Sequence, residues 1–363
     1  MKKFFILFLW FATIIYAVIW TFENPEKIEK IKGEFKKNEK VETKVLTVGS
    51  KNITANSFTV NLLQVLEINS KTAFVTYPSN IKKFDPLNLT IFTQTGFEIK
   101  KNNPKKLNLP NYFTLQRNGG VKTIFYLEEN AFALISSSEG KCFFASIIFL
   151  ENGEEVFRSK CLPEDPSNND FNGLGSSNVH LKESILLSIG TPEKHISKNS
   201  LLAQENRSIF GKILEIKKKD LNEFLEKNSK TFKFKIFSKG HRVPQGLTVL
   251  NDKVFNVEHG PKGGDELNQV IKEKNYGWPV VSYGTNYLKG SGGDGKSIKI
   301  SHEESNYEEP LFAFVPSVGI SALNNCPSVL KKYYKKPCLV ALSLYGNNLR
   351  KGHSLIIFLL NDN

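Results

Sequence analysis

The sequence lacks the cysteine and arginine patterns that mark several common classes of protein. It has four cysteines among 363 residues and no Cys-x-x-Cys pair, which argues against a zinc or thioredoxin-type site. The net charge is +13, but the lysines are spread along the chain with acidic residues between them, and no arginine-rich stripe occurs. Nucleic-acid binding is therefore not expected. The charge instead suits attraction of a folded domain to an anionic membrane surface.

One long hydrophobic run lies at the N-terminus. Lys2 and Lys3 precede uncharged apolar residues from Phe4 to Phe22, and a helix of this length, at about 1.5 Å per residue, nearly spans a hydrocarbon core. No small-x-small cleavage site follows, so residues 1–22 are predicted to be an uncleaved signal anchor, with a cleaved signal peptide as the alternative. The flanking charges predict that the rest is exported, to the periplasm or outside the cell. Residues 23–45 are charged and predict a linker.

The four cysteines fit an oxidising compartment and two disulfides. Cys142 and Cys161 flank a predicted hairpin centred on Asn-Gly, which is a strong turn signal. Pairing residue 151 with 154 places the two cysteines one diagonal apart on one face, so a disulfide can form if the loop is slightly irregular. The second pair would be Cys326 and Cys338. Four buried free thiols are the alternative.

Short strand-like segments fill the chain from about residue 46 onward. Stretches such as TAFVTY, VKTIFYL, CFFASIIFL, PVVSYG (279–284) and CLVALSL are separated by Gly, Asn, Pro and Lys turns. Only DLNEFLEK (220–227) suggests a helix. So many strands exceed one sandwich, and the length favours an all-β, six-bladed β-propeller over residues 46–363, although no clean internal repeat is visible.

Residues 240–268, GHRVPQGLTVLNDKVFNVEHGPKGGDELN, differ from the rest in their density of glycine, histidine and charge. Two strands of a hairpin are predicted within this motif. Arg242 precedes the first strand and His259 follows the second, so both are expected at the open end of the hairpin. A guanidinium in that position suits a planar anion or a carboxylate.

The same motif offers oxygen ligands for a metal. The carbonyls of Gly260 and Pro261, together with the acids Asp265 and Glu266, are hard oxygen donors of the kind that calcium prefers. A purely structural loop is the alternative, in which Arg242 pairs with one of these two acids.

This stretch resembles the glucose/sorbosone dehydrogenases, the soluble glucose and aldose sugar dehydrogenases. The resemblance is carried by GHR-x-PQGL, EHGP-x-GGDELN, NYGWP and SYG-x-x-Y over residues 240–287, and it continues more weakly through 204–213 and 309–321. Residues 46–170 match only in strand rhythm. The resemblance implies a six-bladed propeller that uses pyrroloquinoline quinone and calcium to oxidise the C1 hydroxyl of a sugar and passes the electrons to an unidentified acceptor.

The resemblance also implies roles for individual residues. Arg242 would contact the quinone and polarise its reactive carbonyls, which makes it the candidate catalytic residue. The further cofactor positions would be Gln245, His259 and Asp265. The metal positions would be the carbonyls of Gly260 and Pro261 for the calcium beside the cofactor, and Glu266 and Tyr276 for a structural calcium.

Three features depart from the family pattern. Val243 stands where the family has an asparagine. The histidine that serves as general base is missing from the corresponding stretch, residues 172–177, and the substitutes nearby are His180 and His195. The last stretch, HSLIIFLLNDN, stops before strands that the family normally has, so the propeller is expected to be incomplete at this end.

These features leave alternative functions open. The first is a membrane-anchored, quinone-dependent aldose dehydrogenase, favoured by Arg242 and the acidic loop that follows. The second is a non-catalytic, calcium-stabilised propeller that binds a saccharide or a protein, favoured by Val243 and the missing base. A degenerate relative without stable function is the third.

Overall fold

The chain divides into two compact units, Met1–Asn69 and Ser70–Asn363. The computed structural model describes the strand backbones 43–44, 50–55, 58–63, 67–68 and 73–75, and the ranges 90–100, 103–163, 168–227, 233–287, 295–296, 298, 301–344 and 354–361. The predicted signal anchor, residues 1–22, lies outside the described residues, as does the predicted linker apart from residues 43–44. Among the described residues, no helix is long and apolar enough to cross a membrane.

The described strands of the first unit form two small antiparallel sheets. One pairs β1 (Thr43–Lys44) with β4 (Glu67–Ile68), and the other pairs β2 (Ser50–Ala55) with β3 (Phe58–Leu63).

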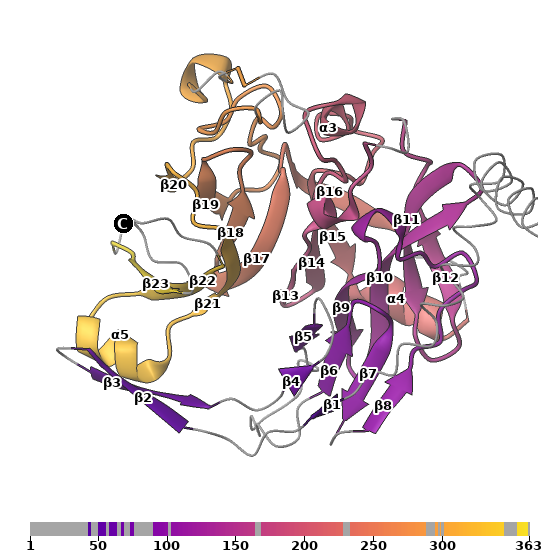
Figure 1. Cartoon of the computed structure of the whole chain (residues 1–363), viewed down its shortest axis with the longest axis horizontal. Helices are drawn as coiled ribbons and strands as arrows, with labels where there is room; N and C mark the ends of the chain where they lie inside the picture. The colour runs from indigo at the N-terminus through magenta and orange to yellow at the C-terminus, as the bar shows by residue number, and fades with distance from the viewer. Residues whose placement is uncertain are drawn as a thin grey trace, which may run out of the picture. The chain divides into compact units, whose positions relative to one another are not determined.

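The second unit is a series of antiparallel meanders in chain order (Figure 1). Four sheets have four strands each: β5 (Ala73–Val75), β6 (Thr90–Thr93), β7 (Phe97–Lys100) and β8 (Asn103–Lys106); β9 (Val121–Leu127), β10 (Asn130–Glu139), β11 (Cys142–Phe149) and β12 (Glu154–Arg158); β13 (Asn178–His180), β14 (Ser184–Ile189), β15 (Lys212–Lys217) and β16 (Phe234–Lys239); β17 (Val243–Leu250), β18 (Lys253–His259), β19 (Asp265–Val270) and β20 (Phe312–Phe314). The fifth sheet has three: β21 (Ile320–Asn325), β22 (Cys338–Ser343) and β23 (Ser354–Leu359). Successive four-stranded meanders are the blades of a β-propeller.

The predicted all-β propeller is confirmed, but the count of six blades is wrong, because the described residues form five. That count assumed blades of similar length. One blade instead holds a long connection between β19 and β20, with no strand in its described part. Within this connection PVVSYG is a turn rather than the predicted strand, because the amides of Val280 and Val281 donate to the Gly277 carbonyl at 2.7 and 3.1 Å.

Among the described residues, helices are few and short. The predicted helix is present as α4 (Lys218–Leu225), which buries Leu221 and Phe224. Two others were not expected, α3 (Lys198–Leu201) and α5 (Ser328–Tyr334). In α5 only Leu330 is buried, so its sequence carries no apolar periodicity from which a helix could be predicted.

Both predicted disulfides are confirmed, Cys142–Cys161 and Cys326–Cys338, and none of the four cysteines is free. The predicted pairing of 151 with 154 is wrong, because Glu154 pairs with Phe149 and the turn is longer than two residues. A register shift between Ile147 and Ile148 then brings the two strand ends together. The irregularity that the disulfide required is therefore a β-bulge in the hairpin.

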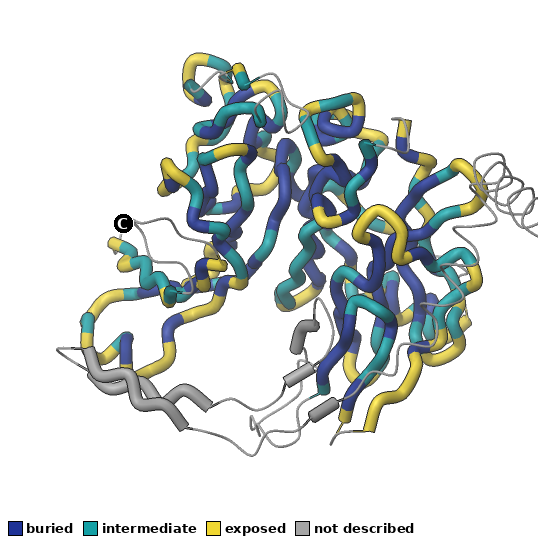
Figure 2. Tube along the Cα trace, viewed as in Figure 1, coloured by how far each residue is buried: buried dark blue, intermediate teal, exposed yellow. Residues whose placement is uncertain are grey.

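The core lies where neighbouring sheets face each other, and Figure 2 shows the buried residues along the strands. Between the second and third blades, Phe132 packs against Phe149 and Phe224 with ring centroids 5.1 and 6.2 Å apart. Burying each such ring contributes about 2–3 kcal/mol. Between the fourth and fifth blades the cluster includes Val257, Ile320 and Leu339. This packing fixes the strand ends that carry the site.

Candidate functional site

The pairing of β17 with β18 brings the predicted site residues together. Val243 lies opposite His259 and Pro244 opposite Glu258, so Arg242 and His259 stand at the same end of the hairpin, as the sequence predicted. The register shifts between Pro244 and Gly246, and Gln245 is the extra residue of this bulge. Bulges are frequent beside functional sites because they redirect neighbouring side chains.

Arg242 is a nearly buried cation, with 8% of its surface exposed. Its Nη1 donates to the carbonyls of His259 at 3.2 Å and Gly260 at 2.5 Å, and its guanidinium lies 5.1 Å from the Trp278 ring centroid. The Nε atom is buried without a hydrogen-bond partner. Among the described residues no carboxylate forms an ion pair with this guanidinium, so the predicted alternative of pairing with an adjacent acid is wrong. A cation so placed still has a donor available for an anion.

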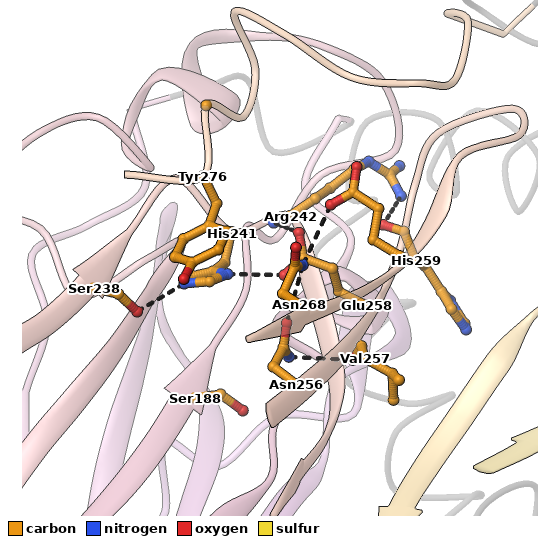
Figure 3. A network of polar contacts seen from close by, with 12 residues as sticks. Ser188, Ser238, His241, Arg242, Asn256, Val257, Glu258, His259, Asn268 and Tyr276 are labelled. Carbon is orange, nitrogen blue, oxygen red and sulfur yellow. Dashed lines mark hydrogen bonds and ion pairs between the residues drawn. The ribbon is translucent and has the colours of Figure 1, made fainter. Parts of the chain in front are cut away.

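A buried polar network, which sequence reasoning missed, holds the backbone of Arg242 (Figure 3). His241 is fully buried, and its ring nitrogens lie 2.9 Å from Glu258 Oε2 and 2.8 Å from Ser238 Oγ. Its ring stacks on Tyr276 with centroids 4.7 Å apart. The other Glu258 oxygen accepts from the Arg242 amide at 3.3 Å. The network therefore fixes the backbone of Arg242, directly before β17 begins.

Asp265 binds backbone and hydroxyl donors from the next blade. One oxygen accepts from the Gly260 amide at 3.2 Å and from Ser317 Oγ at 2.8 Å. The other accepts from the amides of Val318 at 3.0 Å and Ile320 at 3.1 Å. The carboxylate thus joins the loop after β18 to the start of β21.

Glu266 lies directly opposite Glu258 on neighbouring strands, and both are buried. Burial, followed by the charge of Glu258, holds the pKa of Glu266 well above its usual value. Two buried carboxyl groups side by side need a proton or a cation between them.

Tyr276 was predicted as a calcium ligand. Its hydroxyl is occupied, because it donates to the Gln269 carbonyl at 2.5 Å and accepts from the Ile271 amide at 2.9 Å.

The loop of Gly260 and Pro261 is tightly packed backbone. A Cβ at Gly260 would lie 2.2 Å from the Gly264 carbonyl, and Gly264 has φ +70° with Gly284 beside it. These positions need glycine, which explains the motif's composition. The Gly260 carbonyl, a predicted calcium ligand, already accepts from Arg242. Among the described residues no group of three or more His, Cys, Asp or Glu is arranged to hold a metal.

A small pocket opens beside Arg242. Its walls include Glu258, His259, Glu266 and Trp278. Three buried nitrogens of the lining residues have no hydrogen-bond partner, Arg242 Nε, His259 Nε2 and Trp278 Nε1. Burial lowers the pKa of His259, so its imidazole is neutral near neutral pH. The pocket therefore suits a ligand rich in acceptor atoms and negative charge.

Neither substitute for the missing base contacts Arg242. In the third blade His180 pairs with Ile185. At the opposite end of β14, Ile189 pairs with Lys212, and Lys212 in turn pairs with Lys239, three residues before Arg242. His180 therefore lies at the far end of the blade. His195 follows β14 at the near end, where its ring is 5.9 Å from that of Tyr287.

The stretch expected to carry the base has no room for one. A Cβ at Gly173 would lie 2.0 Å from the carbonyl of Thr191. The loop after β14 also packs against the site, because the amide of Thr191 in this loop donates to the Arg242 carbonyl at 2.8 Å. Backbone packing therefore excludes a base at Gly173.

Glu193, in the loop between β14 and α3, is a buried acid that sequence reasoning also missed. Its carboxylate accepts from Thr191 Oγ1 at 3.2 Å and from the Ser200 hydroxyl. Burial raises the pKa of Glu193 to about 7, although the charge of Arg242 lowers it. The segment GTPEKH holds a lone acid among loop residues, so nothing in its pattern predicts burial.

Comparison with known proteins identifies the family. A family model described as "Glucose / Sorbosone dehydrogenase" matches residues 149–351, more than half of the 363 residues. Aldose sugar dehydrogenase YliI of Escherichia coli is 32% identical over 129 residues, and quinoprotein glucose dehydrogenase B of Acinetobacter calcoaceticus is 34% identical over 112 residues. These matches cover 33% and 28% of this chain and 33% and 23% of the two relatives. The chain thus aligns with a third or less of each.

Solved structures agree on the fold. The apo-form of the soluble aldose sugar dehydrogenase from Escherichia coli superposes with a TM-score of 0.53 at 19% identity, covering 79% of this chain and 89% of that one. A glucose dehydrogenase gives 0.54 at 17% identity, covering 88% and 89%. At such identity the likeness concerns the propeller architecture alone.

Proposed function

The chain belongs to the glucose/sorbosone dehydrogenase family, and we propose that it binds pyrroloquinoline quinone beside Arg242 and oxidises the C1 hydroxyl of a sugar. The observation that carries the proposal is the set of unpartnered buried nitrogens on the pocket wall, Arg242 Nε, His259 Nε2 and Trp278 Nε1. The printed names of two relatives, an aldose sugar dehydrogenase and a quinoprotein glucose dehydrogenase, support it. Residues 1–22 would anchor the protein with this domain in the periplasm or outside the cell.

The residues present would bind and orient the quinone, and the quinone would carry out the oxidation. When bound, the quinone supplies the oxidant for the two electrons that leave the sugar. Arg242 offers its free Nε–H to an acceptor oxygen, while the Trp278 face limits movement of the guanidinium. Glu258 fixes the Arg242 amide, and His241 fixes Glu258. This shell keeps the donor oriented before any ligand arrives.

Calcium fits one part of the site and not another. At Gly260 the carbonyl is shared with the Arg242 guanidinium, a competing cation, so this donor does not fit calcium in the observed arrangement. Glu258 and Glu266, buried and opposite each other, fit a cation that would replace the proton held by Glu266. We propose a structural calcium at these carboxylates and derive no catalytic step through it.

A second function is favoured by one observation, the absence of space for a base at Gly173. Without a group to take the hydroxyl proton, sugar oxidation would lose a factor of about 10²–10⁴. The protein would then be a calcium-stabilised propeller that binds an anionic or saccharide ligand without oxidising it.

Titration of the full chain with pyrroloquinoline quinone, followed by dye reduction with aldoses, tests these alternatives. We expect saturable binding that falls about 100-fold in Arg242→Ala, because a charge-assisted contact is lost. The matched control is Arg158→Ala, which removes a guanidinium that also lies over aromatic rings but is partly exposed on another blade. Binding with sugar-dependent dye reduction supports the dehydrogenase. Binding without turnover supports the second function, and equal binding by Arg242→Ala would refute the site.

A further inference from the structure

Glu193 is held in one position inside the protein. It is 4% exposed, and its two carboxylate oxygens accept from hydroxyls of different segments, Thr191 in its own loop and Ser200 in α3. The end of α3 is itself fixed, because the buried Lys212 ammonium donates to the carbonyls of Leu202 and Ala203 at 2.7 and 2.9 Å. Because each oxygen has a donor, the buried carboxylate is held in a fixed position.

The same loop is joined to the backbone of Arg242. The amide of Thr191 donates to the Arg242 carbonyl at 2.8 Å, and the Thr191 hydroxyl, which serves Glu193, lies 3.3 Å from the same carbonyl. Among the charges acting on Glu193, that of Arg242 has the largest effect. The Trp278 indole, which faces the guanidinium, also lies close enough to Glu193 to lower its pKa without a hydrogen bond of ordinary length.

We propose that Glu193 is the counter-ion of Arg242 and sets the charge of the pocket, so that an anionic ligand binds more tightly when Glu193 is protonated. Glu193 is a positioning residue, because it acts through Arg242 and does not line the pocket wall. The inference rests on the proposed function only for the identity of the anion, pyrroloquinoline quinone. A buried cation without an adjacent ion pair needs compensation from a second charge nearby, and Glu193 supplies it.

The sign of the effect follows from the charges. When Glu193 is ionised, it offsets the Arg242 charge and the pocket attracts anions less. When it is protonated, the guanidinium acts uncompensated. The other titratable groups around Arg242 are Glu258, His259 and Glu266 on the pocket wall and Asp265 at the Gly260 amide, and all four stay in place when Glu193 is substituted. Glu193→Gln copies the neutral form, because its amide oxygen accepts from one hydroxyl and its NH2 group can donate to the oxygen of the other.

The first experiment needs no ligand. The chain has three tryptophans, and Trp10 and Trp20 can be replaced by phenylalanine so that emission reports Trp278 alone. We expect the emission of Trp278 to titrate with a midpoint near pH 7, where the pKa of Glu193 lies, and this transition to vanish in Glu193→Gln. The control, Glu223→Gln on the exposed side of α4, should keep it. A transition unchanged in Glu193→Gln would overturn the proposal.

The second experiment measures quinone affinity of the full chain at pH 6 and pH 8. We expect about five- to tenfold tighter binding at pH 6 in the parent chain and equal, tight binding at both values in Glu193→Gln. The same pH dependence in both chains would overturn the proposal while leaving quinone binding intact. Absence of quinone binding in both, with the Trp278 transition lost only in Glu193→Gln, would refute the proposed function and support the counter-ion pair.

Discussion

The two walls of the site differ in the polar groups that they carry. The wall built by β17 and β18 holds a connected polar network, in which His241, Glu258 and Arg242 are buried and hydrogen-bonded. The wall built by the segment before β13 and the loop after β14 is packed backbone, where Gly173 leaves no space beside Thr191. The first wall presents buried donors to the pocket, whereas the second has no space for a side chain at Gly173. In the proposed function, the first wall would hold the ligand and the second would lack the base.

The largest expected effect comes from removing the Glu258 carboxylate from the polar network. Glu258→Ala leaves His241 and the Arg242 amide without their acceptor, so we expect the free energy of unfolding to fall by about 3–5 kcal/mol. Chemical denaturation measures it. The control Glu223→Ala removes an exposed helix acid and should cost less than about 0.5 kcal/mol. Similar losses in both variants would mean that the network does not stabilise this wall.

Placing a base on the packed wall should fail. Gly173→His drives a side chain into the Thr191 carbonyl, and we expect a loss of about 2 kcal/mol in stability without any gain in sugar-dependent dye reduction. Asn172→His, at the exposed neighbouring position, is the control and should change stability by less than about 0.5 kcal/mol. A stable Gly173→His variant with increased turnover would show that this wall can still accept a base.

The buried acid Glu193 predicts a pH dependence of stability. The pKa of Glu193 is about 7 in the folded state and near 4.5 in the unfolded chain, so the unfolded state loses its proton first as pH rises. The free energy of unfolding should therefore fall between these values, by on the order of 1–3 kcal/mol, and level off above pH 7. Urea unfolding at pH 5 and pH 8 measures the slope. Glu193→Gln should reduce it, and Glu266 should leave a residual slope of the same sign.

The smallest expected effect concerns the cation on the polar wall. If calcium lies between Glu258 and Glu266, a chelator should lower Tm by a few degrees, the shift that about 1 kcal/mol produces in a protein of this size. Glu266→Gln should abolish this sensitivity. A chelator effect that persists in the variant would place the calcium elsewhere.

Local patterns accounted for much of the fold. Alternating apolar residues predicted most strands, DLNEFLEK predicted α4, and cysteine spacing around one hairpin predicted Cys142–Cys161. These features depend on residues close together in the chain, where period and turn chemistry act directly. The motif at 240–268 likewise predicted that Arg242 and His259 share one end of a hairpin, because their register is set by the turn between β17 and β18.

Long-range packing decided what local patterns could not. The number of blades depended on where strands pair, and PVVSYG turned back on Gly277 instead of joining a sheet. The burial of Glu193 depended on Ser200 in α3. Neither contact can be predicted from the periodicity of apolar residues along the chain.

The sequence by itself therefore determined the strand-rich architecture, the Cys142–Cys161 disulfide and the residues of the motif at 240–268, because each is specified by spacing within a short segment. Only the tertiary structure decided the charge environment of that motif. Arg242 donates to the Gly260 carbonyl, which was expected to hold calcium, Glu193 is buried near it, and Gly173 is closed to a base. The physical reason is that desolvation and steric exclusion depend on every segment that surrounds a group, not only on its neighbours in the chain.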